Sequence, residues 1–231
     1  MILSRPPLSG VIGPSTVPAP QVEYDGRNLT GNTGDDITTW VDSSGNGRNA
    51  TGTAGGVPKV QLSGLNGNPV SRWDGGAGDK LNFSSAPVAT SFTCIAVMKC
   101  TDGGTRTLLA EGTGGDGPPR FYIDANKISL SEDDNVTVTA STTLSTSTFY
   151  TVAVTYNSAT NGYVFYVNGS SDGSGTSAIT FTRAFARVGC RSGNQNTFLG
   201  DIAYDAFWNT VLTSGQLTAK FAQLQAIWGH Y

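Results

Sequence analysis

Alternating apolar and polar positions predict β-strands over most of the chain, because successive side chains of a strand point to opposite faces. The clearest pattern lies in residues 149–169, FYTVAVTYNSATNGYVFYVNG. Tyr150–Tyr156 and Tyr163–Val167 carry apolar residues on both faces, which predicts two strands buried on both sides. The turn formers of Asn157–Gly162 lie between them, and their Asn-Gly pair suits the positive φ angles of a hairpin turn.

Similar short patterns predict further strands, separated by segments rich in Gly, Ser, Asn and Asp. The predicted strands are Val70–Asp74, Lys80–Phe83, Phe92–Lys99, Thr107–Ala110, Arg120–Asp124, Lys127–Leu130, Val136–Thr139, Ile179–Thr182, Ala186–Gly189 and Leu199–Trp208. The acidic run Glu132-Asp133-Asp134 is predicted to be a solvated turn between two of them.

One helix is predicted near the C-terminus, from about Ser214 to Trp228. Thr213 and Gln216 have the spacing of a capping box, and Gly229 suits the position just after a helix. Apolar residues then recur on one helical face at Leu217, Phe221, Leu224 and Trp228. An amphipathic helix of this kind is expected to pack against a sheet.

Composition agrees with a β protein and excludes several classes of partner. Charged residues are only 13% and the chain holds 30 glycines among 231 residues, as expected for short strands joined by tight turns. The net charge of −3, without basic runs, excludes a typical nucleic-acid or anionic-membrane partner. No stretch approaches the roughly 18 apolar residues of a membrane span. The first residues lack a basic leader followed by an apolar block, so we expect no signal peptide and folding in a cytoplasm.

The N-terminal segment differs from the rest. Residues 1–20 contain five of the ten prolines and show no hydrophobic period, so residues 1–21 are predicted to form an extended Pro-rich arm and residues 22–231 the domain. We expect the arm to dock on a partner chain through apolar side chains such as Ile2, Leu8 and Ile12.

Four motifs, in the right order, resemble those of one family. They are the hairpin pattern VAVTY…FYVNG, the segment WVDSSGNGRNAT at residues 40–51, RWDGGAGDKLNF at residues 72–83, and GDIAYDAFWN at residues 200–209 followed by Leu-Thr-Ser and a helix. They resemble laminin-G-like domains of the concanavalin A-like lectin/glucanase superfamily. The resemblance implies an all-β fold, a two-sheet antiparallel β-sandwich (jelly roll) with one C-terminal helix. It departs at Tyr204-Asp205, where the family often has an acid, and in the arm.

Catalytic motifs are missing from the sequence. Retaining glucanases of this fold use a Glu-x-Asp-x-Glu strand whose carboxylates lie about 5 Å apart. The chain has three glutamates, Glu23, Glu111 and Glu132, none within five residues of another. The single histidine, His230, has no partner motif, and residues 112–117 lack the Gly-Lys-Ser/Thr of a phosphate loop. We therefore predict no enzyme activity and no cofactor.

A metal site has one candidate. Asp42, Ser44 and Asn46, followed by Gly47, match positions 1, 3, 5 and 6 of a calcium loop, but Thr53 stands at position 12 instead of a bidentate Glu. The same residues also close tight turns on their own backbone, so a turn and a calcium site both remain open. The prediction for the chain is no bound metal.

The three cysteines cannot all pair. Cys94 and Cys100 are roughly 20 Å apart along one predicted strand, and a disulfide needs Cα atoms within about 7 Å. Cys190 could reach one of them. The alternative is three small buried residues in a reducing compartment.

Sugar binding is the remaining chemistry. Five aromatic residues have two interpretations, as exposed platforms for sugar rings or as core residues. They are Trp40, Trp73, Tyr122, Tyr204 and Trp208. The most lectin-like segment is the polar loop at residues 191–198. The predicted ligand-binding residues are Arg191, Asn194, Gln195 and Asn196.

Two functions fit these features. The first is a non-catalytic virion structural protein of a bacteriophage, which decorates the head or tail with a lectin-like jelly roll. Its partners would be other virion proteins, bound through residues 1–20, and host surface polysaccharide, within a large homo- or hetero-oligomeric assembly. The alternative is a carbohydrate-binding module of a bacterial cell-surface or secreted system. The arm favours the first, because a lectin module has no use for an anchor.

Overall fold

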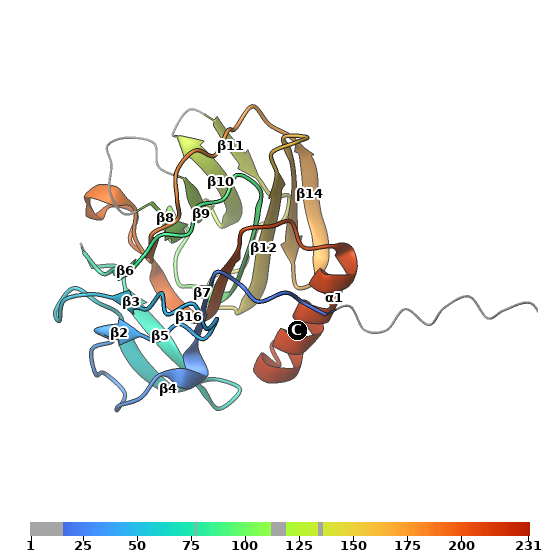
Figure 1. The fold of residues 1–231 in the computed structure, drawn as a ribbon. Coiled ribbons are helices and arrows are strands. Elements are labelled where there is room, and N and C mark those ends of the chain that lie inside the picture. Colours follow the sequence, from blue (N-terminus) through green and yellow to red (C-terminus); the bar gives the residue numbers. More distant parts are fainter. Residues whose placement is uncertain (1–15, 77, 112–118, 134–135) are drawn as a thin grey trace, which may run out of the picture.

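A computed structural model describes residues 16–76, 78–111, 119–133 and 136–231. Two antiparallel β-sheets face each other, and one α-helix, α1 (Ser214–Trp228), lies outside them (Figure 1). The first sheet, sheet A, has the strand order β14-β13-β12-β7-β16-β5-β4, with β1 paired to β16. Its strands are β1 (Val22–Asp25), β4 (Lys59–Leu65), β5 (Asn68–Asp74), β7 (Phe92–Cys100), β12 (Tyr150–Asn157), β13 (Gly162–Val167), β14 (Ser170–Thr176) and β16 (Leu199–Trp208).

The second sheet, sheet B, has the order β11-β10-β9-β8-β15-β6-β3-β2. Its strands are β2 (Thr39–Trp40), β3 (Ala50–Thr51), β6 (Leu81–Phe83), β8 (Arg106–Ala110), β9 (Arg120–Asp124), β10 (Lys127–Asp133), β11 (Val136–Thr139) and β15 (Arg187–Val188). Two single 3₁₀ turns, η1 (Gly26–Asn28) and η2 (Ser192–Asn194), complete the elements of the described residues. The predicted all-β sandwich with one C-terminal helix is therefore confirmed.

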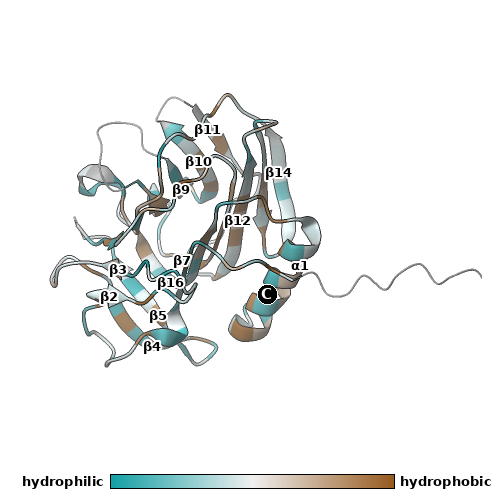
Figure 2. Cartoon of the chain, in the orientation of Figure 1, coloured by the Kyte–Doolittle hydropathy of each residue, from teal (hydrophilic) through white to brown (hydrophobic). Residues whose placement is uncertain are grey.

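The main core lies between the sheets. Alternate residues of each strand point inward, and Figure 2 shows hydrophobic segments along the strands of both sheets. An aromatic cluster around Phe92 fills one part of this core, with the rings of Phe181, Phe185 and Phe207 at centroid distances of 4.8–5.8 Å. Strand β12 is buried on both faces as predicted, whereas in β13 only Phe165 is fully buried.

A second, smaller core lies between α1 and the outer face of sheet A. The helix buries Leu217, Phe221, Leu224 and Trp228 against β7 and β16, as its apolar face predicted. Thr213 and Gln216 form the predicted capping box, and Gly229 ends the helix with left-handed φ and ψ. Among the described residues, no helix has the length and apolar character needed to cross a membrane.

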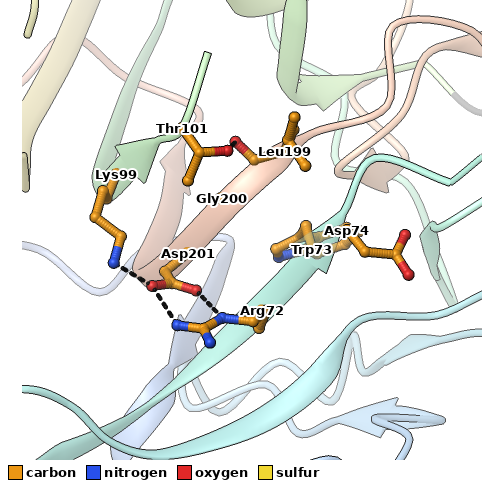
Figure 3. A pocket seen from close by; sticks show the side chains of 8 residues that line it. All are labelled: Arg72, Trp73, Asp74, Lys99, Thr101, Leu199, Gly200 and Asp201. Atoms are coloured by element: carbon orange, nitrogen blue, oxygen red, sulfur yellow. Dashed lines mark hydrogen bonds and ion pairs between the residues drawn. The ribbon is translucent and has the colours of Figure 1, made fainter. Parts of the chain in front are cut away.

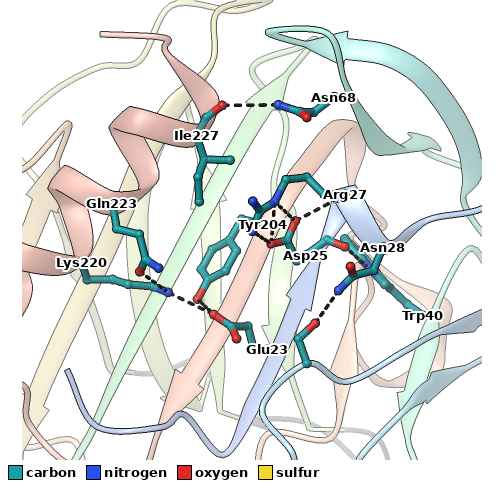
Figure 4. Close-up of polar contacts among 11 residues, drawn as sticks. Glu23, Asp25, Arg27, Asn28, Trp40, Asn68, Tyr204, Lys220, Gln223 and Ile227 are labelled. Carbon is teal, nitrogen blue, oxygen red and sulfur yellow. Dashed lines mark hydrogen bonds and ion pairs between the residues drawn. The ribbon is translucent and has the colours of Figure 1, made fainter. Parts of the chain in front are cut away.

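A polar clamp ties α1 to β1 and β16 (Figure 4). The ammonium of Lys220 lies 3.0 Å from an Oε1 of Glu23, and the hydroxyl of Tyr204 donates to the same oxygen at 2.6 Å. The ammonium also lies 4.7 Å from the centre of the Tyr204 ring. At the other end of the helix, the side-chain amide of Asn68 donates to the carbonyl of Ile227 at 3.3 Å. These contacts fix the helix on the sheet.

The described end of the N-terminal segment lies against the same helix. The indole of Trp208 donates to the carbonyl of Pro18 at 2.8 Å, and Gln216 donates to the carbonyl of Thr16 at 3.4 Å. The backbone then joins sheet A, where the amide of Gln21 donates to the carbonyl of Phe207. Residues 1–15 of the predicted arm lie outside the described residues, so the boundary at residue 22 stays a prediction.

Several details of the predicted strands are wrong, and β1, β2, β3 and β4 were not predicted. Residues 179–182 form no strand, because their backbone pairs with no other strand. The apolar side chains of Ile179 and Phe181 are nevertheless buried in the core, which explains the apolar pattern. Strand β10 continues through Glu132 instead of turning there. Strand β14 was missed because its sequence, SSDGSGT, has no apolar residue; it pairs at the edge of sheet A. The three cysteines are buried and free, as expected for small buried residues.

Candidate functional site

Three loops meet at one end of the sandwich. They follow β5 (residues 75–80, of which residue 77 is not described), β7 (residues 101–105) and β15 (residues 189–198). The ammonium of Lys80 donates to Oδ1 of Asn194 at 2.7 Å. The backbone amide of Thr107 donates to the carbonyl of Asn196 at 2.9 Å. Segments more than a hundred residues apart therefore form one surface, which we call the loop site.

The loop at residues 191–196 folds back on itself. The amide of Arg191 donates to the carbonyl of Gln195 at 3.1 Å, and Asn194 and Asn196 both adopt positive φ angles, which asparagine tolerates better than most residues. The structure separates the four predicted site residues. Asn194 and Gln195 are exposed, Asn196 is half-buried and Arg191 is buried. Two side-chain amides thus face solvent, and the arginine lies beneath them.

A glycine lets this loop lie close to the core. Gly189 has φ 84°, and a Cβ at this position would lie 1.9 Å from the ring of Trp73. The Trp73 ring also meets the edge of Phe198 at a centroid distance of 6.5 Å. The indole therefore supports the loop from below, and any larger residue at position 189 would push the loop away.

Arg187 was missed by sequence reasoning, and it lies directly beneath the loop. Its Nη1 donates to the carbonyl of Arg191 at 3.1 Å, and its Nε donates to Oδ1 of Asn82 at 2.8 Å. Arg187 occupies the outward position of β15, opposite Ala110 of β8. The outward, polar position in a short apolar strand was the one signal that could have singled it out.

The outward side of sheet B, beside the loop site, carries polar side chains, most of which are buried. In β9 and β10, Phe121, Ile123, Ile128 and Leu130 face the core, and the alternate positions face outward. The outward side chains are Arg120, Tyr122, Ser129 and Ser131, with Thr107 on β8 and Thr137 and Thr139 on β11.

These outward side chains contact one another across the strands. The guanidinium carbon of Arg120 lies 4.4 Å from the centre of the Tyr122 ring, and the Tyr122 hydroxyl lies 3.3 Å from that of Thr137. The hydroxyls of Thr107 and Ser131 are buried without a hydrogen-bond partner among the described residues. A buried hydroxyl without a partner is costly, so this face carries unused hydrogen-bonding capacity.

A carboxyl pair borders the loop site. Burial raises the pKa of Asp79 to about 6, and a hydrogen bond with Asp74 adds to the effect. The same hydrogen bond lowers the pKa of Asp74, whose Oδ1 also accepts from the amide of Gly76 at 2.7 Å. One proton is therefore held between these two carboxyls below about pH 6.

The aromatic candidates are buried residues. Trp40, Trp73, Tyr122, Tyr204 and Trp208 are all at most 4% exposed. Four of them belong to the two cores, and Tyr122 is buried on the outward side of sheet B, so the aromatic-platform interpretation is wrong. Polar side chains at the loop site and the exposed Thr137 and Thr139 on sheet B remain as ligand contacts.

The three glutamates have neighbours that give them structural roles. Glu23 belongs to the clamp on α1. Glu111 lies 3.1 Å from Arg183, and Oε1 of Glu132 accepts from a backbone amide at 3.1 Å. Burial raises the pKa of Glu132.

The Asp42 loop has the geometry of a closed turn. Oδ1 of Asp42 accepts from the amides of Glu23 and Ser44, and Oδ2 accepts from the amide of Arg48 and the hydroxyl of Ser44, all at 2.8–2.9 Å. Burial opposes ionisation of this carboxyl, but these hydrogen bonds outweigh it and lower its pKa. Because N–H and O–H donors occupy both oxygens, the geometry supports the turn over the calcium site. Within the described part of the chain, no three His, Cys, Asp or Glu residues cluster as metal ligands would.

Chemically, the loop site offers two solvent-facing amides, a lysine ammonium and backbone carbonyls. The neighbouring face of sheet B adds hydroxyls, of which those of Thr137 and Thr139 are on exposed residues. These groups donate and accept hydrogen bonds, and the carboxyl pair Asp74 and Asp79 lies at the border of the site. Such an arrangement suits recognition of a hydroxyl-rich ligand.

Comparison with known proteins identifies similar domains. Residues 74–218 match the sequence model of the family described as the concanavalin A-like lectin/glucanases superfamily. No curated protein sequence matches the chain at a significant level.

Solved structures share the fold at low sequence identity. Domain 4 of AbnA, a GH43 extracellular arabinanase from Geobacillus stearothermophilus, solved in complex with arabinotriose, is 16% identical with a TM-score of 0.64, covering 88% of this chain and 98% of that domain. The CBM40 of the Ruminococcus gnavus IT-sialidase, bound to α2,3-sialyllactose, is 20% identical with a TM-score of 0.51, covering 58% and 84%.

The similarity to Trypanosoma rangeli sialidase covers only part of the enzyme. It is 17% identical with a TM-score of 0.61 and covers 96% of this chain. The chain spans only 36% of that sialidase's length. At these identities the likeness concerns the fold.

Proposed function

The chain belongs to the concanavalin A-like lectin/glucanases superfamily, and we propose that it is a non-catalytic carbohydrate-binding protein. The observation that carries this proposal is the loop site, where Asn194 and Gln195 face solvent beside Lys80. Planar amides donate and accept at once, which matches vicinal sugar hydroxyls. Two similar structures, from the arabinanase and the IT-sialidase, were solved with bound saccharides, which adds support from the fold.

The absence of a catalytic arrangement in the sequence supports a non-catalytic role. The Glu-x-Asp-x-Glu strand of retaining glucanases is missing from the sequence. The three glutamates that the sequence does contain have the structural contacts described above. Binding without turnover is therefore the activity that this chain's residues support best.

We further propose that the protein belongs to a bacteriophage particle and is attached by its N-terminal segment. The low charge, the Gly-rich composition and the five prolines before residue 21 support this role. The fold supports it geometrically as well. Pro18 bonds to Trp208 at one end of β16, and the loop site adjoins Leu199 at the other end. Ten residues of strand separate these ends by roughly 30 Å, so an anchored arm would leave the loop site free.

Glycan binding is tested with a panel of immobilised host polysaccharides. We expect the full chain to bind at least one of them and the double variant Asn194→Ala/Gln195→Ala to lose at least about tenfold in affinity. The matched control, Ser170→Ala/Ser171→Ala, changes two exposed residues of edge strand β14 and should bind normally. Equal binding by both double variants would remove the loop site from the proposal. Release of sugar from the panel would contradict the non-catalytic role.

Attachment is tested by co-sedimentation with phage particles. A chain that begins at Thr16 keeps the contacts of Thr16 and Pro18 with the body. We expect it to bind glycan but not to sediment with particles, whereas the full chain does both. Sedimentation of the shortened chain would place the docking surface on the sandwich. Glycan binding without sedimentation of the full chain would favour a bacterial carbohydrate-binding module.

A further inference from the structure

A pocket on the outer face of sheet A borders the loop site at Thr101. Its volume is about 420 Å³, and it lies on β5, β7 and β16 (Figure 3). The helix α1 packs on the same face of sheet A. The pocket volume falls in the range of about 300–1,000 Å³ that small-molecule sites occupy. The polar residues of its floor are Arg72, Lys99 and Asp201.

These three residues form a charged row across three strands. Arg72 and Lys99 flank Asp201 in the strand register. Nε and Nη2 of Arg72 lie 2.8 and 3.1 Å from the two carboxylate oxygens, and Nζ of Lys99 lies 2.6 Å from Oδ2. Asp201 is only 1% exposed, so its carboxylate is held inside the protein by two cations. One positive charge of the row remains without a counter-charge within it.

The remaining charge faces the pocket. Nε and Nη2 of Arg72 donate hydrogen bonds to Asp201, and within the described residues its Nη1 has no hydrogen-bond acceptor. The ring of Phe149 lies 4.8 Å from the Lys99 ammonium and covers another side of it. Asp74 also lines the pocket, but Figure 3 shows its carboxylate turned away from the two cations, and it bonds to the amide of Gly76. An added anion would therefore meet two donors and no facing carboxylate other than the neutralised Asp201.

Backbone geometry fixes the row. Gly200 has φ 144°, and a Cβ there would lie 1.9 Å from the carbonyl oxygen of Lys99. Because this position has no side chain, β16 approaches β7 closely just before Asp201. The carboxylate and the ammonium are consequently held together before any ligand arrives, which lowers the cost of ordering the site on binding.

We propose that this pocket binds the carboxylate of an acidic sugar residue, a uronic acid. The guanidinium and ammonium recognise the carboxylate. The side chain of Leu199 offers an apolar wall for the C–H face of the ring, and the exposed Thr101 places a hydroxyl at the rim for a sugar hydroxyl. The inference extends the proposed function by naming the class of glycan, and of the loop site it uses only Thr101.

The test is a titration of the full chain, followed by NMR, with sodium glucuronate, glucose and sodium acetate as probes. We expect glucuronate to bind with a Kd of about 1 mM, acetate to bind at least about tenfold more weakly, and glucose to leave the Arg72 and Thr101 signals unmoved. Arg72→Gln should weaken glucuronate binding at least about tenfold. Thr101→Val changes an exposed residue and keeps the ion pairs, so it should fold normally and weaken binding several-fold.

Each alternative outcome overturns a defined part of the inference. Unmoved Arg72 and Thr101 signals at about 50 mM glucuronate would show that the pocket is not a carboxylate site. Equal affinity for acetate and glucuronate would leave an anion site without sugar recognition and overturn the proposal. The loop-site variant Asn194→Ala/Gln195→Ala should bind glucuronate normally, and its failure would place the acidic sugar at the loops. A wild-type chain that binds glucuronate here but no polysaccharide at the loop site would refute the proposed function alone.

Discussion

Asp205 provides the most direct test of how this sandwich is built. It lies in β16 between Tyr204 and Ala206, which both face α1, so Asp205 faces the main core. It is fully buried opposite Ala96 and Tyr24, and neither carboxylate oxygen has a side-chain hydrogen-bond partner among the described residues. Burial raises the pKa of Asp205 well above the usual range of an aspartate. The folded protein therefore keeps this carboxyl protonated to a higher pH than the unfolded chain does.

The consequence for stability follows from proton linkage. Above about pH 4 the unfolded chain releases the Asp205 proton and the folded chain keeps it, so the free energy of unfolding falls as pH rises. The fall is about 1.4 kcal/mol for each pH unit, until pH reaches the folded pKa. Asp205→Asn removes the ionisation but keeps the shape. Its stability relative to the wild type should therefore rise with pH, by about 1.4 kcal/mol for each pH unit between the unfolded and the folded pKa of Asp205.

Urea unfolding of both proteins at several pH values measures this difference. Asp79, with a pKa of about 6, and His230, whose pKa burial lowers to about 4, titrate in both proteins and cancel in the comparison. Asp205→Val should also be more stable than the wild type at neutral pH, since it removes a buried polar group that has no side-chain partner. If the difference in the free energy of unfolding between Asp205→Asn and the wild type does not change with pH, the raised pKa of Asp205 in the folded protein is refuted.

Three further predictions concern packing and polar contacts. Lys220→Met removes the ion pair with Glu23 and should lower the free energy of unfolding by about 2 kcal/mol, measured by urea unfolding. Gly189→Ala should lower the melting temperature far more than Gly45→Ala does. The two glycines have similar φ angles, 84° and 87°, but only at Gly189 would an added Cβ meet an aromatic ring. Equal decreases in melting temperature would contradict the clash with the ring. Thr107→Val removes a buried hydroxyl without a partner and should keep or raise the melting temperature; a clear decrease would reveal a hydrogen bond.

Local sequence patterns determined most of the fold. The predicted hairpin corresponds to β12 and β13, and the capping box at Thr213 and Gln216 marks the start of α1. These features depend on residues a few positions apart, so a single sequence contains them. Residues 179–182 show the limit, because their side chains are buried while their backbone pairs with no strand.

The candidate sites depended much less on local pattern. The polar loop at residues 191–196 could be singled out from its composition, but Arg191 is buried and Lys80, which bonds to Asn194, comes from another part of the chain. The pocket brings Arg72 to Asp201 across 129 positions. Sequence reasoning had no signal for this pair, because strand order in a sheet decides which distant residues become neighbours.

Asp205 illustrates the same division within one strand. Strict alternation from Asp201 would place residue 205 on the outer face of sheet A with residues 201 and 203. A β-bulge between Ile202 and Tyr204 adds one residue on one side of the ladder, so the alternation reverses and Asp205 turns inward. The sequence by itself determined that residues 199–208 form a strand. Only pairing with β7 in the folded protein decided which side chains face the core, because a bulge is defined by two strands together.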